Sequence, residues 1–185
     1  MADQHEIIIA GFGGQGVLLA GNLLSYAAII EGKNVSFFPS YGVEKRGGEA
    51  MCTVVIADGE VGSPVVGAPS VTILLNQASL DKYGGRTRPG GTCIINTSLV
   101  DIGRFDRRDI EIILMPMNDI ALELGDSRMV NMVAVGAYAA QTRAVGIQSL
   151  TEALKDALPE RNHGFIPANV RAIEAGAARI TAENT

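Results

Sequence analysis

The feature with the clearest chemistry is a glycine-rich loop at Gly11–Gly16, which reads G-F-G-G-Q-G and satisfies G-x-G-x-x-G. It follows an aliphatic run at Glu6–Ala10 and opens a helix-like pattern at Gln15–Glu31, so we predict a strand, a tight turn and a helix. Backbone N–H groups at such a helix start attract anions. We therefore predict a phosphate or carboxylate site at Gly11, Gly13, Gly14, Gln15 and Gly16. The alternative is that these glycines only let the helix pack closely on the strand.

A dinucleotide site would need one more residue. In nicotinamide- and flavin-binding folds, an acidic side chain at the end of the second strand binds the ribose hydroxyls. Here the second strand runs into V-S-F-F-P-S-Y, with Glu31 before it and Glu44 well beyond it. The fingerprint is incomplete, so a stand-alone nucleotide-binding protein or dehydrogenase is the alternative function rather than the favoured one. Tyr41 and Lys45 could form a proton relay only on a helix, and they lie in a predicted loop.

The second group of reactive side chains lies in this loop, Pro39–Glu49, which holds three glycines and no clear period. A loop after a parallel strand faces the ligand crevice in open α/β sheets. Lys45 and Arg46 can bind an anion there, although Glu44 and Glu49 can pair with them instead. We add to the predicted binding residues Tyr41, Lys45, Arg46 and Gly47. A solvated charged loop is the alternative.

Composition excludes several classes of function. The chain has 185 residues, a net charge of −5 and a pI near 5.0, which argues against a nucleic-acid or anionic-membrane partner. No apolar stretch reaches the ~18 residues of a membrane span, and the N-terminus lacks a basic leader, so we expect a cytoplasmic protein. Cys52 and Cys93 lie in apolar runs and predict buried, inert thiols. Two cysteines cannot hold an iron–sulfur cluster, and His5 and His163 suggest no metal site.

Aliphatic runs separated by helical patterns predict one doubly wound, Rossmann-like α/β domain over residues 1–185, with a largely parallel sheet and helices on both faces. An antiparallel hairpin of Met51–Ala57 with Val61–Val66 would make the sheet mixed. Three consecutive helices at the C-terminal end should stack on one side. The other predicted strands are Val35–Phe38, Val71–Leu75, Thr92–Asn96 and Ile110–Met115, and the other helices are Gln77–Tyr83, Met117–Leu124, Val130–Val145, Ser149–Leu158 and Pro167–Ile180.

One predicted helix, Val130–Val145, carries a single amide, Asn131, among apolar residues. A structural hydrogen bond is its favoured role, and a ligand contact is the alternative. Ala134 and Gly136 are small enough to let a second helix approach closely.

Three segments together resemble the gamma subunits of pyruvate, 2-oxoglutarate and related 2-oxoacid:ferredoxin oxidoreductases. They are I-I-I-A-G-F-G-G-Q-G-V at Ile7–Val17, S-Y-G-V-E-K-R-G-G-E-A at Ser40–Ala50 and E-L-G-D-S-R-M-V-N-M-V-A-V-G-A at Glu123–Ala137. The resemblance spans essentially the whole chain in order. The motif G-x-G-G-Q-G-V followed by S-Y-G-x-x-x-R-G-G is fairly specific, whereas G-x-G-x-x-G alone is weak.

The resemblance implies a complex that converts a 2-oxoacid and coenzyme A to acyl-CoA, carbon dioxide and reduced ferredoxin. It implies that thiamine diphosphate, magnesium and iron–sulfur clusters lie on alpha, beta and delta-type partner subunits, which contact ferredoxin. This sequence lacks the G-D-G…N thiamine motif, to which Gly125-Asp126-Ser127 comes closest. The gamma chain would then be non-catalytic and would help to hold coenzyme A, a polyanion suited to Gly11–Gly16, Lys45 and Arg46. Which oxoacid is used cannot be read from these motifs.

Overall fold

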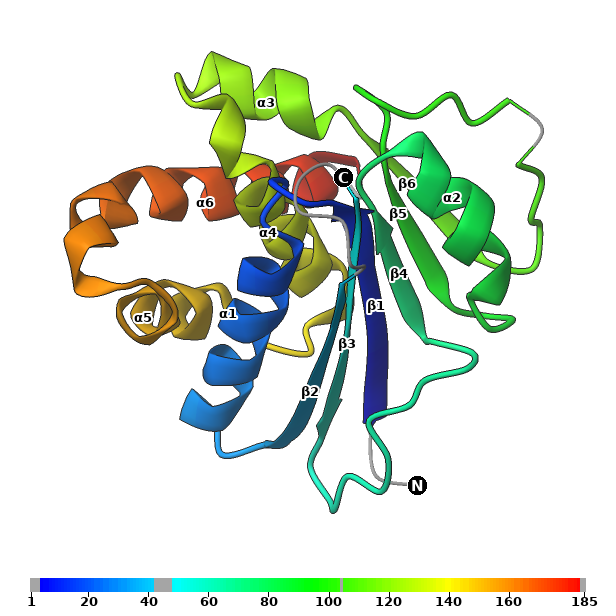
Figure 1. The fold of residues 1–185 in the computed structure, drawn as a ribbon, viewed down its shortest axis with the longest axis horizontal. Helices are drawn as coiled ribbons and strands as arrows, with labels where there is room; N and C mark the ends of the chain where they lie inside the picture. The colour runs from blue at the N-terminus through cyan, green and yellow to red at the C-terminus, as the bar shows by residue number, and fades with distance from the viewer. Residues whose placement is uncertain (1–3, 42–47, 104, 184–185) are drawn as a thin grey trace.

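The computed structural model describes residues 4–41, 48–103 and 105–183, and its six strands form one sheet (Figure 1). The elements are β1 (Gln4–Phe12), α1 (Val17–Ile30), β2 (Asn34–Tyr41), β3 (Glu49–Ala57), β4 (Val71–Leu74), α2 (Gln77–Tyr83), β5 (Thr92–Asn96), β6 (Glu111–Met115), α3 (Met117–Glu123), α4 (Val130–Thr142), α5 (Ile147–Ala157) and α6 (Ile166–Glu183). Three short 3₁₀ turns are η1 (Gly84–Arg86), η2 (Ser127–Met129) and η3 (Glu160–Phe165).

The sheet has the order β2-β3-β1-β4-β5-β6, and β3 runs against both of its neighbours. The pairs β1–β4, β4–β5 and β5–β6 are parallel. The predicted doubly wound α/β class with a mixed, largely parallel sheet is therefore confirmed.

The predicted hairpin of β3 with residues 61–66 is wrong, because those residues form no strand. Gly62 and Pro64 weaken any ladder there, since glycine adds backbone entropy and proline lacks an N–H donor. The segment instead lies along β3, where Thr53 Oγ1 donates to the Pro64 carbonyl at 2.9 Å. The loop predicted over 39–49 is also shorter than expected, because β2 continues to Tyr41 and β3 begins at Glu49.

Alternating residues of β1 face two separate cores. Ile7 and Ile9 belong to a large core with α1, α4, α5 and α6, whereas Ile8 and Ala10 belong to a smaller core with α2. Figure 1 shows α1 and α4–α6 on one side of the sheet and α2 on the other. Helices on both faces, and the stacking of the last three helices on one side, are confirmed.

A close contact between helices joins α4 and α6 through two glycines. A Cβ atom at Gly136 would collide with the carbonyl oxygen of Ile173, and one at Gly176 would collide with that of Val133. Each glycine therefore lets the opposite backbone come nearer than any side chain would allow. The close approach predicted at Gly136 is confirmed, and it fixes the position of α4, whose first turn reaches the glycine loop.

Candidate functional site

The candidate site lies where β1 and β4 end side by side. The helix that follows β1 covers one face of the sheet, and the helix that follows β4 covers the other. In open α/β sheets, such a switch point between neighbouring parallel strands leaves a crevice at their carboxyl ends, and ligands bind there. The glycine loop joins β1 to α1 at this point.

The loop turns sharply from β1 into α1. Gly14 and Gly16 have φ angles of 113° and 72°, which other residues adopt only with strain. Gly16 is the N-cap of α1, and no side chain provides a capping hydrogen bond. The first N–H groups of a helix lack partners within the helix, and here the positive end of the dipole also lacks a nearby acidic residue in the first turn. The predicted strand–turn–helix arrangement is confirmed.

The side chain of Gln15 is turned inward and braces this loop. Its Oε1 accepts from Phe12 N at 2.9 Å and from Asn76 Nδ2 at 3.3 Å, and its Nε2 donates to the Leu75 carbonyl at 3.2 Å. A Cβ at Gly11 would meet Gln15 Oε1 at 2.5 Å, so this glycine is needed for packing. Gly13 N donates to the Gly48 carbonyl at 2.8 Å. The ligand-binding role predicted for these residues stays a prediction.

A second buried amide, that of Asn96, donates to the same Leu75 carbonyl as Gln15. Asn96, at the end of β5, donates to the Leu75 carbonyl at 3.0 Å and to Asn118 Oδ1 at 2.7 Å, and it accepts from Met117 N at 3.1 Å. These bonds tie the ends of β4 and β5 to the start of α3.

Replacing Asn96 by alanine is expected to lower the free energy of unfolding by about 2 kcal/mol, because it leaves buried polar groups without partners. Urea denaturation followed by circular dichroism measures the change. Asn118→Ala is the control, and it should cost less because Asn118 is only half-buried. Equal costs for the two variants would contradict this role of Asn96.

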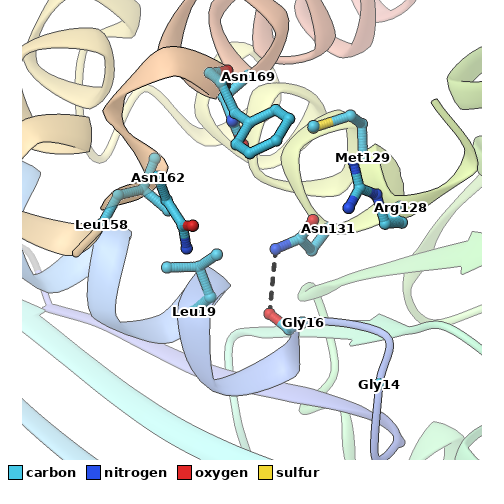
Figure 2. Close-up of a pocket in the computed structure, with 10 residues that line it drawn as sticks. Gly14, Gly16, Leu19, Arg128, Met129, Asn131, Leu158, Asn162 and Asn169 are labelled. Atoms are coloured by element: carbon cyan, nitrogen blue, oxygen red, sulfur yellow. Dashed lines mark hydrogen bonds between the residues drawn. The ribbon is translucent and has the colours of Figure 1, made fainter. Parts of the chain in front are cut away.

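A cavity of about 210 Å³ opens beside the start of α1, between it and the elements around α4 and α6 (Figure 2). Asn131 Nδ2 donates to the Gly16 carbonyl at 3.2 Å, so the predicted structural hydrogen bond is confirmed. The same residue lines the cavity together with Gly14, Gly16, Leu19, Arg128, Met129, Leu158, Asn162, Phe165 and Asn169. The sequence therefore predicted the hydrogen-bonding role of Asn131, and the structure shows in addition that Asn131 lines the cavity.

Arg128 is a cation that lines this cavity. Its Nη2 lies 2.7 Å from Asp126 Oδ2, and its guanidinium lies 5.3 Å from the centre of the Phe165 ring. The hydrogen bonds from Arg128 lower the pKa of Asp126 to about 2. Arg128 and Gly16, the N-cap of α1, line the same cavity.

A second cavity of about 280 Å³ lies on the α2 side of the glycine loop. Glu49 binds Lys82 Nζ through both oxygens, at 2.7 and 2.6 Å, and accepts a short hydrogen bond from Tyr83 Oη. The bonds from Lys82 and Tyr83 hold the pKa of Glu49 below its ordinary value of 4.5. Glu49 is the last residue of the predicted loop Pro39–Glu49 and the first of β3, so this cluster anchors the start of β3.

The lowered pKa of Glu49 predicts the direction in which stability changes with pH. A carboxyl whose pKa is depressed by folding stabilises the protein above its unfolded pKa near 4.5, and this contribution is lost as the pH falls through the folded pKa. The side chain of Glu49 is 42% exposed, so solvent screening limits the contribution to less than about 1 kcal/mol. Glu49→Gln should therefore show slightly lower stability at pH 7 and a shallower loss of stability between pH 5 and 3, measured by urea denaturation. The exposed Glu60→Gln is the control; a slope unchanged by Glu49→Gln would refute the assignment.

The structure brings together only part of the predicted binding set. Gly14 and Gly16 line the cavity beside α1, and Gly11 lines the cavity beside α2. Tyr41 ends β2 and pairs with Ala50 of β3, so its backbone lies two strands away from β1. Lys45, Arg46 and Gly47 lie outside the described residues.

Several residues that line the two cavities were not predicted from the sequence. Asn76, after β4, could have been found from the rule that ligands meet strand ends, and Arg128 stands in the same quoted segment as Asn131. Asn162, Phe165 and Asn169 carry no sequence signal, because the packing of elements distant in sequence decides which residues line the cavity.

The cysteines are both free and buried, as predicted. Burial raises the pKa of Cys52 to about 12 and also raises that of Cys93, so both thiols stay protonated at neutral pH. Among the residues that the structure describes, no three or more His, Cys, Asp or Glu side chains are grouped to bind a metal ion. No helix in the described ranges has the length and hydropathy to span a membrane.

Comparison with known proteins gives one family. The family model described as pyruvate ferredoxin/flavodoxin oxidoreductase matches residues 6–179. The ketoisovalerate oxidoreductase subunit VorA of Methanothermobacter marburgensis is 40% identical over 93% of this chain and 36% of its own length. The 2-oxoglutarate synthase subunit KorC of the same organism is 36% identical over 94% of this chain and 95% of its own length.

A solved structure has a similar fold. The keto/oxoacid ferredoxin oxidoreductase gamma subunit of Geobacter sulfurreducens superposes with a TM-score of 0.81 at 29% identity, covering 96% of this chain and 99% of that one. The chain spans about a third of the length of the VorA relatives that it matches, 36% and 35%, and nearly all of KorC.

Proposed function

The chain belongs to the pyruvate ferredoxin/flavodoxin oxidoreductase family, and we propose that it serves as the gamma subunit of a multi-subunit 2-oxoacid:ferredoxin oxidoreductase. The proposed complex decarboxylates 2-oxoglutarate or pyruvate oxidatively, with coenzyme A as acceptor of the acyl group and ferredoxin as acceptor of the electrons. Alpha, beta and delta-type subunits carry the thiamine diphosphate, magnesium and iron–sulfur clusters. This chain contributes coenzyme A binding, subunit assembly or both, and is inactive alone. Its cytoplasmic location stays a prediction.

The observation that supports a coenzyme A role is the uncapped start of α1. Its free N–H groups and the Arg128 guanidinium border the same cavity, so a phosphate there would meet a helix dipole and a cation together. In this proposal the chain binds a polyanion. The groups that react with the 2-oxoacid lie on the other subunits. The donor set fits coenzyme A phosphates, whereas the acidic ribose partner of a dinucleotide is missing at the end of β2.

The test is a purification followed by two measurements. The tagged chain, expressed with its neighbouring reading frames, should co-purify with companion subunits and reduce a dye only when a 2-oxoacid and coenzyme A are both present. Titration calorimetry on the complex should give heat with coenzyme A and none with NAD. Heat with NAD alone, from a chain that purifies without companions, would support a stand-alone nucleotide-binding protein or dehydrogenase instead.

A further inference from the structure

Helix α1 contains no charged residue, since its sequence is V-L-L-A-G-N-L-L-S-Y-A-A-I-I. A helix that is apolar all round is normally buried on every side, whereas a surface helix carries charged residues on its outer face. The neighbouring helices follow this rule. Helix α4 also lacks charged residues, and its residues 130–139 are all buried. Helices α5 and α6 are exposed on one side, and there they carry charged side chains such as Glu152, Lys155, Arg171 and Glu174.

The outer face of α1 departs from the rule, because the residues that the structure describes leave it uncovered. Six residues form this face, which we call the outer stripe of α1: Leu18, Leu19, Asn22, Tyr26, Ile29 and Ile30. A helix turns by about 100° per residue, so these six lie within about 120° of one another. Tyr26, Ile29 and Ile30 are 37%, 56% and 43% exposed. Asn22 is exposed as well, and the two leucines are partly buried.

The stripe begins at the cavity beside α1 and continues to the end of the helix. Leu19 lines that cavity together with Leu158 (Figure 2). Figure 1 shows α1 between α5 and β2, with its last turn far from the glycine loop. In the proposed function, coenzyme A at the cavity has to reach groups that lie on other subunits. A companion chain must therefore lie beside the cavity, and the outer stripe is an apolar surface that adjoins it.

We propose that the outer stripe of α1 is the docking surface for a companion subunit of the same complex, which covers it with an apolar, uncharged surface. A charged side chain placed against the stripe would lose its hydration without gaining a partner of opposite charge. Asn22 and Tyr26 offer hydrogen-bonding groups that suit an uncharged polar side chain of the companion. The proposal rests on the proposed function, which supplies the companion subunits.

A second copy of this chain fits the stripe less well than a companion does. Fourteen helical residues form a stripe about 21 Å long and about 10 Å wide, which offers on the order of 200–400 Å² of surface. A stable dimer buries about 800 Å² on each partner. A smaller contact suffices between parts that other contacts or a tether already hold together. In the VorA relative, the region that matches this chain is 36% of a longer chain, so there it is tethered.

A lipid surface also fits less well. Helices that lie on membranes combine an apolar face with a polar face rich in lysine and arginine, which binds anionic headgroups. Helix α1 has neither residue, and the chain has a net charge of −5. A protein surface is therefore the occupant that matches the uncharged stripe.

The test is Ile29→Lys in the complex that is co-expressed from the neighbouring reading frames. Dilution of the purified complex, followed by mass photometry, gives the dissociation constant between this chain and its companions. We expect Ile29→Lys to raise that constant at least tenfold, because it places a charge in the middle of an apolar contact. The melting temperature of the isolated variant should stay within about 2 °C of the parent, since a surface substitution changes folding stability little.

Leu122→Lys is the matched control. Leu122 is 67% exposed, which is more than Ile29. Both residues lie in the last turn of a helix that has no basic residue there, where a lysine suits the helix dipole. The control should change the dissociation constant by less than about twofold. An unchanged constant in Ile29→Lys, or an equal rise in both variants, would overturn the proposal.

A measurement without any substitution tests the same surface. Hydroxyl-radical footprinting should oxidise the Tyr26 ring in the isolated chain and at least fivefold less in the complex. Tyr83 and Tyr138 are 3% and 0% exposed and should stay unreactive in both. Equal oxidation of Tyr26 in the two samples would overturn the proposal.

Two results would assign the stripe to another occupant and thereby overturn the proposal. The first is an isolated chain that is dimeric in light scattering at micromolar concentration and becomes monomeric in Ile29→Lys. The second is an isolated chain that binds vesicles of phosphatidylcholine and phosphatidylglycerol and no longer does so in Ile29→Lys.

The docking surface and the proposed function fail in different ways. If the complex reduces a dye in the presence of a 2-oxoacid and coenzyme A, but Ile29→Lys assembles like the parent, the function stands and the docking surface falls. If Ile29→Lys releases the companions of a complex that lacks this activity, the docking surface stands and the function falls. A chain that purifies without companions overturns both.

Discussion

Gly136→Ala is expected to destabilise the protein by about 3 kcal/mol, and Gly136→Val is expected to prevent folding. The added Cβ would overlap the carbonyl oxygen of Ile173, which is backbone of α6 and cannot rotate away as a side chain would. Overpacking of this kind commonly costs about 1–3 kcal/mol even where neighbouring side chains can move. The higher helix propensity of alanine recovers up to about 1 kcal/mol, which the backbone collision exceeds.

Urea denaturation of Gly136→Ala measures this cost. Gly164→Ala is the control, because nothing lies within 4 Å of a Cβ there and the φ angle is ordinary. The control should stay within about 0.5 kcal/mol of the parent. A Gly136→Ala variant as stable as this control would show that α4 and α6 can separate without loss, and would contradict the packing described above.

Gly16→Ala is expected to weaken coenzyme A binding at least tenfold. Its φ angle of 72° strains any residue with a Cβ, and that Cβ would overlap the Asn131 amide. The loop would then lose both its turn and the hydrogen bond that holds it to α4. We expect a smaller loss of stability, about 1–2 kcal/mol, because the loop can relax toward solvent.

Gly32 offers a matched control for Gly16. It has a φ angle of 73° at the other end of α1, with nothing within 4 Å of a Cβ. Gly32→Ala therefore imposes the same backbone strain without touching the cavity, and should lose stability while keeping its affinity for coenzyme A. If calorimetry gives both variants the same affinity, the glycine loop is a packing device, as the alternative interpretation of the sequence holds.

Local patterns were sufficient for most of the fold. The aliphatic runs that became β4 and β5, and the helix Gln77–Tyr83, are set by hydrophobicity and nearby caps such as Asn76, which accepts from Ser79 N. The glycine loop was found for the same reason, since its turn and helix start are encoded within six residues.

Features that depend on distant residues were not predictable in this way. β3 lies between β1 and β2 and runs against both, and no local pattern distinguishes that pairing from a hairpin with residues 61–66. Asn169 of α6 lines the same cavity as Asn131 of α4, and Gly136 and Gly176 let these two helices pack closely. The two glycines can be identified in a single sequence, but the distance between α4 and α6 cannot be predicted from it.

The reversed direction of β3 has a consequence for how such a chain can diversify. Because β3 runs against β2, Tyr41 ends one strand and Glu49 begins the next at the edge where Phe12 ends β1. The residues between them join strands that backbone pairing already holds together, and doubling such a connection costs only about 0.6 kcal/mol in closure entropy. Insertions and charge changes at this position can therefore accumulate without reorganising the sheet. The same scaffold can in this way vary the sequence between Tyr41 and Glu49 while the pairing of β1, β2 and β3 is kept.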